Sequence, residues 1–275
     1  MKNISKILVI VDSIDIEDSS GSKANVALIN NLKQAGFELL VYHYTLKDIK
    51  LKGIKTITIP EIKWSIFYFL SRLQRVLSRN LKINLASFFE GVFGFSFTFF
   101  NDTKSISKSL KKILFQSDLV LTLSKGASFR SHYAVLQLPH LHHKWIVYVH
   151  DPYPFHYYPR PYNWVESSYY QKELFFRKLS EKANYSAFPS QLLKEWMSSY
   201  FPNFDKTGTI LPHQNEKYEV QNTVFPSYFD ISKFNLLHAG NLLKQRSPEG
   251  LIEGFKLFLE RNPNEYEFSD IDMTQ

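Results

Sequence analysis

A short segment near the C-terminus combines backbone and side-chain features that could hold a phosphate. Residues 234–239 have the apolar pattern of a strand, and Gly240 follows at a turn that carries Lys244 and Arg246. Ser247-Pro248 then favours the start of a helix, because a Ser oxygen caps free backbone N–H groups and Pro has its φ pre-set for the first turn. A cationic turn at a helix N-terminus is a suitable place for an anion. The segment therefore predicts a phosphate-binding turn.

A second group of polar residues follows an apolar segment in the middle of the chain. Residues 144–150 have the pattern of a strand that ends in His150, and Asp151 comes directly after it. Open α/β sheets bind ligands at the carboxyl ends of their strands, so His150 could contact a ligand there; a ring satisfied by loop carbonyls is the alternative. The next loop is rich in aromatic residues and Pro and contains Arg160. It suits a sugar with an anionic group, and it equally fits a packed surface loop.

The first predicted strand–helix connection carries Ser20 and Gly21. A Gly at this position would let the backbone approach a phosphate at the N-terminus of the following helix, and an ordinary turn glycine explains it equally well. Neither a Gly-x-Gly-x-x-Gly fingerprint nor a P-loop occurs in the sequence.

Three clustered histidines have the composition of a metal site: His140, His142 and His143. No carboxylate lies near them in the sequence, so surface histidines are the better interpretation. The chain has no Cys, which excludes disulfides and thiolate metal sites. We expect neither a metal nor a cofactor.

Composition indicates a folded protein with an anionic partner. The 275 residues are 44% hydrophobic and 21% charged, as in globular proteins. The net charge of +7 suggests a nucleotide-sugar, an anionic lipid or a nucleic acid; the basic residues are scattered, which disfavours the nucleic acid. The apolar run at 7–11 is too short for a signal-peptide core or a membrane span, so we expect a cytoplasmic protein.

Alternating patterns of strand and helix predict an α/β fold with a doubly wound, mostly parallel sheet. We expect a first domain over 1–213, a linker over 214–233, and the start of a second domain of the same type over 234–275. The predicted strands of the first domain lie at 7–11, 37–43, 55–59, 117–124, 144–150, 184–190 and 209–212. The predicted helices lie at 23–35, 163–182 and 191–199.

Residues 61–100 are unusually rich in aromatic side chains and cations. Trp64, Phe67, Leu70, Leu73 and Leu77 fall near one helical stripe, with Arg and Lys residues between them. We favour a core-packing helix and hairpin with a basic, solvent-facing edge. The alternative is a patch that lies at a membrane surface, where aromatic side chains enter the headgroup layer and cations meet anionic lipid.

Several of these segments, in this order, resemble the retaining family 4 glycosyltransferases of the GT-B fold. The similar segments are the Gly-bearing loop and helix at 19–41, the strand ending in His at 147–151, the strand ending in Ser at 186–191, the segment Thr209-Ile-Leu-Pro-His-Gln, and the turn at Gly240. Asn241 stands where the family has Arg, and His213-Gln214 where it has Asn-Gly.

The resemblance implies sugar transfer, with retention, from a nucleotide-sugar to an acceptor hydroxyl, without a metal. It gives catalytic roles to His150 and Asp151, and substrate contacts to Ser20, Gly21, Arg160, Gly240, Lys244 and Arg246. A lipid-linked or polysaccharide acceptor of the cell envelope would fit, with a peripheral contact to the inner face of the membrane through 62–100, and no nucleic acid.

The family's pair of ribose-binding glutamates does not follow Gly240 in this sequence. We therefore expect a donor domain that is truncated early and little or no transfer by this chain alone. A non-catalytic remnant that binds an acceptor or a membrane is the alternative.

Overall fold

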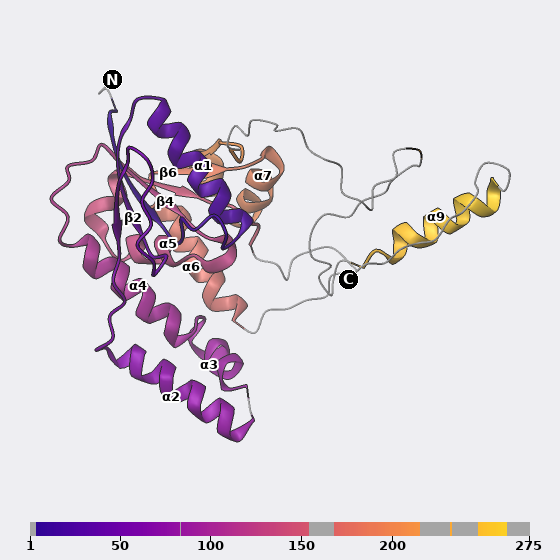
Figure 1. Ribbon diagram of the computed structural model, residues 1–275, viewed down its shortest axis with the longest axis horizontal. Helices are drawn as coiled ribbons and strands as arrows, with labels where there is room; N and C mark the ends of the chain where they lie inside the picture. Colours follow the sequence, from indigo (N-terminus) through magenta and orange to yellow (C-terminus); the bar gives the residue numbers. More distant parts are fainter. Residues whose placement is uncertain (1–3, 83, 154–167, 215–231, 233–246, 263–275) are drawn as a thin grey trace. The chain divides into compact units, whose positions relative to one another are not determined.

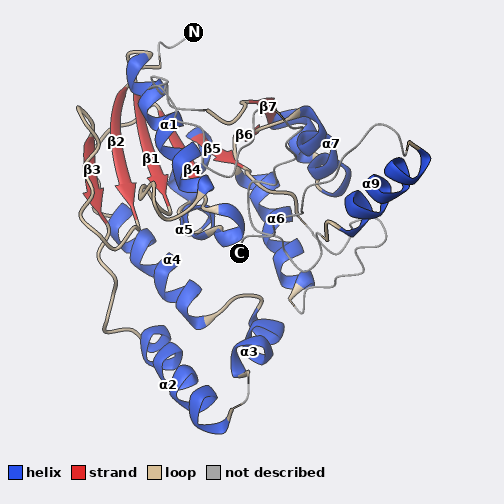
Figure 2. Cartoon of the chain, turned by 45° about the vertical axis from the view of Figure 1, so that its right-hand side comes forward, coloured by secondary structure: helices blue, strands red, loops and turns tan. Residues whose placement is uncertain are grey.

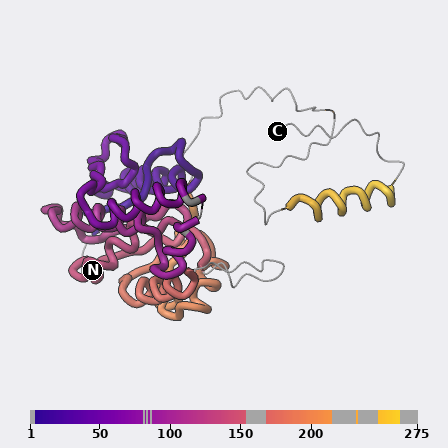
Figure 3. The backbone as a smooth tube through the Cα atoms, turned by 90° about the horizontal axis from the view of Figure 1, so that it is seen from below, coloured from indigo at the N-terminus to yellow at the C-terminus, as the bar shows by residue number. Residues whose placement is uncertain are grey.

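A computed structural model describes residues 4–82, 84–153, 168–214, 232 and 247–262 of the chain. The chain divides into two units, residues 1–218 and 219–275. The backbone of the first unit runs from indigo at the N-terminus to orange near residue 210 in Figure 3.

The first unit is built on one seven-stranded sheet in which all neighbouring strands pair in parallel. The strand order is β3-β2-β1-β4-β5-β6-β7, which Figure 2 shows as a row of red arrows. At the centre, Val9 of β1 is in register with Val41 of β2 on one side and Leu121 of β4 on the other. The strands are β1 (Lys6–Val11), β2 (Glu38–His43), β3 (Lys55–Thr58), β4 (Leu119–Leu123), β5 (Trp145–Tyr148), β6 (Tyr185–Phe188) and β7 (Gly208–Ile210).

Helices cover both faces of this sheet. The α-helices of the first unit are α1 (Ser20–Gln34), α2 (Ile66–Leu81), α3 (Leu85–Phe93), α4 (Phe97–Leu110), α5 (Arg130–Leu136), α6 (Tyr169–Lys182), α7 (Gln191–Tyr200) and α8 (Asn203–Thr207). Two 3₁₀ turns, η1 (Gly126–Ser128) and η2 (Pro139–Lys144), follow β4 and α5. Helix α1 packs on one face of the sheet, while α4, α5, α6, α7 and α8 contribute to the core on the other face. The predicted α/β class with a doubly wound parallel sheet is confirmed.

The sequence of each central strand explains why both faces must be covered. Alternate residues of β1 enter different cores: Ile7 and Val9 pack with α1, and Leu8 and Ile10 pack on the opposite face. A strand buried on both sides is a continuous apolar run, as parallel sheets require. Gly36 then ends the helical turn after α1 with a φ of 94°, a conformation that favours glycine.

Most predicted elements are confirmed, with shifted ends. Helix α1 begins at Ser20, three residues before the predicted start, because Ser19 caps it by accepting a hydrogen bond from the Ser22 N–H. The described part of the helix predicted at 163–182 begins at Tyr169. The strand predicted at 234–239 and the turn at Gly240 lie outside the described residues.

The core-packing interpretation of residues 61–100 was wrong for much of the predicted stripe. Trp64, Leu73 and Leu77 are exposed, and Phe67 and Leu70 are only half-buried. The segment forms α2, α3 and the start of α4 instead of a helix and a hairpin. Helices α2 and α3 lie beyond α4, away from the sheet (Figures 1 and 2).

The second unit is described mainly through one helix, α9 (Glu249–Arg261). The Glu249 N–H donates to the Ser247 hydroxyl at 3.2 Å, but Ser247 stands one residue before the cap position and is not the cap that the sequence predicted. Pro248 occupies the cap position directly before Glu249.

Candidate functional site

The candidate site lies beside two neighbouring strands whose following helices pack on opposite faces of the sheet. Strands β1 and β4 are neighbours, but α1 after β1 and α5 after β4 cover opposite faces. Ligands of doubly wound sheets bind beside such a switch point, at the carboxyl ends of the strands. We call the residues that gather there the carboxyl-edge site: Asp12, Gly21, Gly126, His150, Asp151 and His213.

Asp12 ties the loop after β1 to the loop after β4. Its side chain is buried and accepts hydrogen bonds from the N–H of Lys125 at 3.2 Å and the N–H of Ser131 at 2.8 Å. The Ser128 hydroxyl also donates to it. A carboxylate with three donors is satisfied without leaving the interior, so Asp12 organises this edge.

Across the same two loops, the Lys125 ammonium contacts Asp18 at 2.6 Å. This hydrogen bond holds the pKa of Asp18 below its usual value.

Gly21, Gly126 and Asp151 form a close contact between three connections. A Cβ on Gly21 would lie 3.4 Å from the backbone nitrogen of Gly126, and a Cβ on Gly126 would lie 3.3 Å from a carboxylate oxygen of Asp151. Gly126 also has a φ of 52°, which disfavours a side chain. At Gly21 a Cβ would make ordinary van der Waals contact, so the structure leaves room for a side chain there. The contact of Gly21 with a ligand stays a prediction. The contact of Ser20 with a ligand also stays a prediction, and Ser20 lies exposed at the start of α1.

His150 follows β5 and is buried among aromatic rings. Only 8% of it is exposed, and its ring lies edge-on to Tyr148 at 4.4 Å between centroids. Its Nδ1 lies 3.3 Å from Nε2 of His213, in hydrogen-bonding distance. Its Nε2 is buried and has no hydrogen-bond partner among the described residues. The chain thus orients one ring nitrogen and leaves the other buried without a partner among the described residues.

Burial lowers the pKa of His150 to about 3, and the nearby His213 and His132 act in the same direction. The ring is therefore neutral near pH 7. A neutral imidazole carries one N–H donor and one bare acceptor, and the hydrogen bond at Nδ1 sets which role Nε2 has. His150 can therefore give or accept one hydrogen bond without adding a charge to the site.

Another buried histidine lies close to His150. His132 on α5 shares a hydrogen bond with the Thr122 hydroxyl at 2.8 Å, and Trp145 donates to the same hydroxyl at 2.8 Å. Burial lowers the pKa of His132 to about 4, although Asp12 and the Tyr148 backbone act in the opposite direction. His132, Thr122 and Trp145 thus form a buried, uncharged hydrogen-bonded group close to His150.

Three of the predicted site residues come together: Gly21 and Asp151 meet around Gly126, and His150 is the chain neighbour of Asp151. Arg160, Gly240, Lys244 and Arg246 lie outside the described residues.

Asp12, Lys125 and His213 were missed as site residues. Each of the three follows shortly after a strand, and this position in the sequence could have marked them as site residues. Their partners are more than 60 positions away in the sequence, so no local pattern joins them.

The three clustered histidines do not belong to this site. His140 and His143 are exposed in η2. The Nε2–H of His142 donates to the Val135 carbonyl oxygen at 3.2 Å, and the His142 ring stacks on Trp145. Over the described ranges, no three His, Cys, Asp or Glu side chains are placed to share a metal ion.

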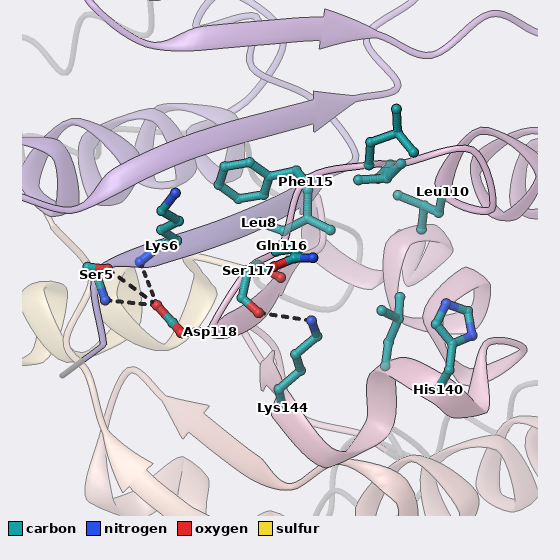
Figure 4. A pocket seen from close by; sticks show the side chains of 13 residues that line it. Ser5, Lys6, Leu8, Leu110, Phe115, Gln116, Ser117, Asp118, His140 and Lys144 are labelled. Atoms are coloured by element: carbon teal, nitrogen blue, oxygen red, sulfur yellow. Dashed lines mark hydrogen bonds between the residues drawn. The ribbon is translucent and has the colours of Figure 1, made fainter. Parts of the chain in front are cut away.

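A cavity of about 810 Å³ lies at the opposite edge of the sheet (Figure 4). It is lined by residues around the amino ends of β1 and β4, including Lys6, Asp118 and His140. Asp118 accepts from the N–H groups of Ser5 and Lys6, both at 3.1 Å, so its charge serves the strand ends. In parallel strands this edge is a full strand length from the carboxyl-edge site, and the cavity is separate from it.

None of the helices in the described part of the chain combines the length and the apolar character needed to cross a bilayer.

No protein-family model matches the chain, and no curated protein sequence matches it. Among solved structures, it is similar to a glycosyltransferase from Rickettsia africae ESF-5, with 14% identity over 76% of this chain and 43% of that one, at a TM-score of 0.42. It is also similar to an alpha,alpha-trehalose-phosphate synthase (UDP-forming) from Burkholderia vietnamiensis, with 10% identity over 73% of this chain and 43% of that one, at a TM-score of 0.41. The chain spans less than half the length of either protein.

Proposed function

We propose that this chain carries the acceptor-side domain of a GT-B glycosyltransferase of the retaining, family 4 type. The observation that carries the proposal is His150 at the carboxyl end of β5, which is buried and neutral and whose Nε2 has no hydrogen-bond partner among the described residues. The motif order along the sequence, from the loop at 19–41 to the turn at Gly240, supports the same proposal. The reaction is transfer of a sugar from a nucleotide-sugar to an acceptor hydroxyl.

In this proposal His150 hydrogen-bonds the donor sugar beside the reacting carbon. A neutral ring suits that task, because it adds a directed hydrogen bond without a full charge next to a carbon that becomes electron-poor. Asp151 lies against Gly126 in the adjoining loop and would contact substrate from there.

The donor diphosphate belongs, in the proposal, to the second unit. Gly240 would admit the phosphates to the backbone, and Lys244 and Arg246 would neutralise the leaving diphosphate together with a helix N-terminus. The chemistry then needs no metal ion. Helix α9 follows this turn and begins at Glu249.

For the acceptor we propose a lipid-linked or polysaccharide hydroxyl of the cell envelope, reached from the cytoplasm at the inner face of the membrane. A non-catalytic protein that binds an acceptor or a membrane is the second candidate. Exposed apolar side chains on α2 and α3 favour it, because membrane contact needs no donor.

Transfer and donor binding separate the two candidates. The full chain would be incubated with a panel of nucleotide-sugars, with released nucleoside diphosphate and bound donor measured in parallel. Donor binding that weakens in Arg246→Gln supports the glycosyltransferase, even where turnover is slow. Absence of binding and turnover for every donor would favour the non-catalytic protein.

A further inference from the structure

Helix α2 turns an apolar stripe toward solvent. Ile66, Phe69, Leu73 and Val76 are between 54% and 67% exposed, and Leu77 is 39% exposed. Their spacing of three, four and seven residues puts them on one side of the helix. A helix on the surface of a water-soluble domain normally buries such a stripe.

The side of α2 that faces the protein is partly polar. Ser71 is buried, and Gln74 and Ser78 are half-buried at the helical spacing that follows it. Ser65, which caps the helix, donates to the amide oxygen of Asn101 on α4 at 2.5 Å. Phe67 of α2 also packs against Phe100 of α4, with 5.4 Å between the ring centroids. Helix α2 is therefore attached to α4 through polar side chains and one aromatic pair, while the exposed stripe points to solvent.

Nearby residues extend the exposed apolar surface. Trp64 is 88% exposed, and its ring lies edge-on to Phe69 at 6.2 Å. Helix α3, which contacts α2, adds Phe88, Val92 and Phe93, all at least half exposed. We call this set the α2–α3 apolar face. Large apolar patches of this kind mark interaction sites on soluble proteins.

Helix α2 carries only positive charge, whereas α3 contains Glu90. Between Ile62 and Phe89 the sequence contains five cations and no Asp or Glu. The cations are Lys63, Arg72, Arg75, Arg79 and Lys82. In the described structure none of the five is in an ion pair, and Arg72 lies over the ring of Tyr68 at 4.9 Å. Arg72 and Arg79 are seven residues apart, so they flank the stripe on one side.

We propose that the α2–α3 apolar face docks on the surface of an anionic lipid bilayer, with α2 lying in the interface and its arginines at the headgroups. A bilayer offers an apolar layer and an anionic layer at adjacent depths, which matches the order of side chains around α2. A second copy of this chain fits less well, because a symmetric contact would bring five cations against five others. The assignment of the acceptor to a membrane lipid rests on the proposed function. The docking of the α2–α3 apolar face on a bilayer does not depend on sugar transfer.

The test is co-flotation of the full chain with vesicles of phosphatidylcholine alone or of phosphatidylcholine mixed with phosphatidylglycerol. We expect binding to the mixed vesicles that weakens as salt is raised. Replacing Arg72, Arg75 and Arg79 together by Gln should lower the affinity roughly 100-fold, since each cation near an anionic surface contributes about a fivefold effect. Replacing Phe69, Leu73 and Val76 together by Gln should abolish flotation.

The neighbouring helix α4 offers a matched control. Lys104, Lys108 and Lys111 are exposed cations at similar spacing, and their joint replacement by Gln removes the same charge. This control should float nearly as wild type does. Circular dichroism and urea unfolding of every variant should match wild type, because all the changed side chains are exposed or half-exposed.

Three results would overturn the docking: no flotation of the wild type, equal flotation of the apolar-face variant, or equal losses in the α4 control. Self-association that the apolar-face variant loses, without vesicle binding, would assign the face to a second copy. Flotation with no transfer or donor binding would leave the docking in place and remove the glycosyltransferase proposal.

Discussion

His150 shows at the level of one residue how burial decides chemistry. A histidine directly after a strand is visible in the sequence, but its protonation state depends on its surroundings. The fold places it beside Tyr148 and His213 and removes it from water, which lowers the pKa to about 3. The result is a neutral hydrogen-bonding group at the carboxyl edge of the sheet.

Replacing His150 by Ala should lower kcat for sugar transfer about 100-fold or more, in a protein that has measurable transfer. The reason is that the proposed function puts His150 beside the reacting carbon, where a group acts mainly in the transition state. Steady-state kinetics with varied acceptor would separate kcat from KM.

His143→Ala is the matched control, since His143 is an exposed histidine in η2. It should leave both constants unchanged. An unchanged kcat in the His150 variant would make this residue structural.

At the scale of elements, Asp12 joins β1 to the connection between β4 and α5. Its carboxylate accepts from two backbone N–H groups and a hydroxyl that lie more than 110 residues away in the sequence. The switch point of the sheet is therefore held by one side chain, and not by the strand pairing alone.

Asp12→Ala should lower the free energy of unfolding by about 3 to 5 kcal/mol, because it leaves buried N–H groups without an acceptor. Urea unfolding followed by circular dichroism measures the change. Asp205→Ala is the control: this carboxylate is 76% exposed and pairs with Lys194 at 3.6 Å, so its loss should cost less than about 1 kcal/mol. Equal losses in the two variants would contradict the assigned role of Asp12.

Helix α2 shows what a pattern leaves open at this scale. The cations were visible in the sequence and a helix was predicted there, but the predicted stripe shares only Leu73 and Leu77 with the exposed stripe on α2. Which side faces the protein depends on the partner surface, and α4 presents Asn101 and Ser105 to this region, with Ser105 accepting from the Ile62 N–H at 3.0 Å. These polar contacts, with the packing of Phe67 on Phe100, turn one side of α2 toward α4 and leave the stripe exposed.

For the molecule as a whole, the buried histidines make stability depend on pH. His132 and His150 have pKa values of about 4 and about 3 in the folded chain, against 6.5 for an exposed histidine. Above pH 6.5 both are neutral in the folded and unfolded states. As the pH falls below 6.5, the unfolded chain takes up protons first, so stability is lost progressively toward the folded pKa values.

Between pH 7 and about pH 5, each of the two histidines should lower the free energy of unfolding by roughly 2 kcal/mol. Urea unfolding at a series of pH values would measure this slope. His132→Gln keeps a hydrogen-bonding partner for the Thr122 hydroxyl and removes one titrating group, so its slope should be clearly less steep over this range, while His150 and the buried His43 still contribute. The same slope in this variant would show that other groups dominate.

The sequence by itself determined the class of the fold, because continuous apolar runs alternating with amphipathic segments fit only a parallel sheet covered on both faces. It also determined where polar residues follow strands, and so predicted His150, Asp151 and Gly21 at one edge. The tertiary structure alone decided which of these residues meet, through Gly126 and His213, since strand order brings together positions far apart in the chain. It also decided that α2 faces outward, because packing against α4 depends on both surfaces and neither helix specifies it alone.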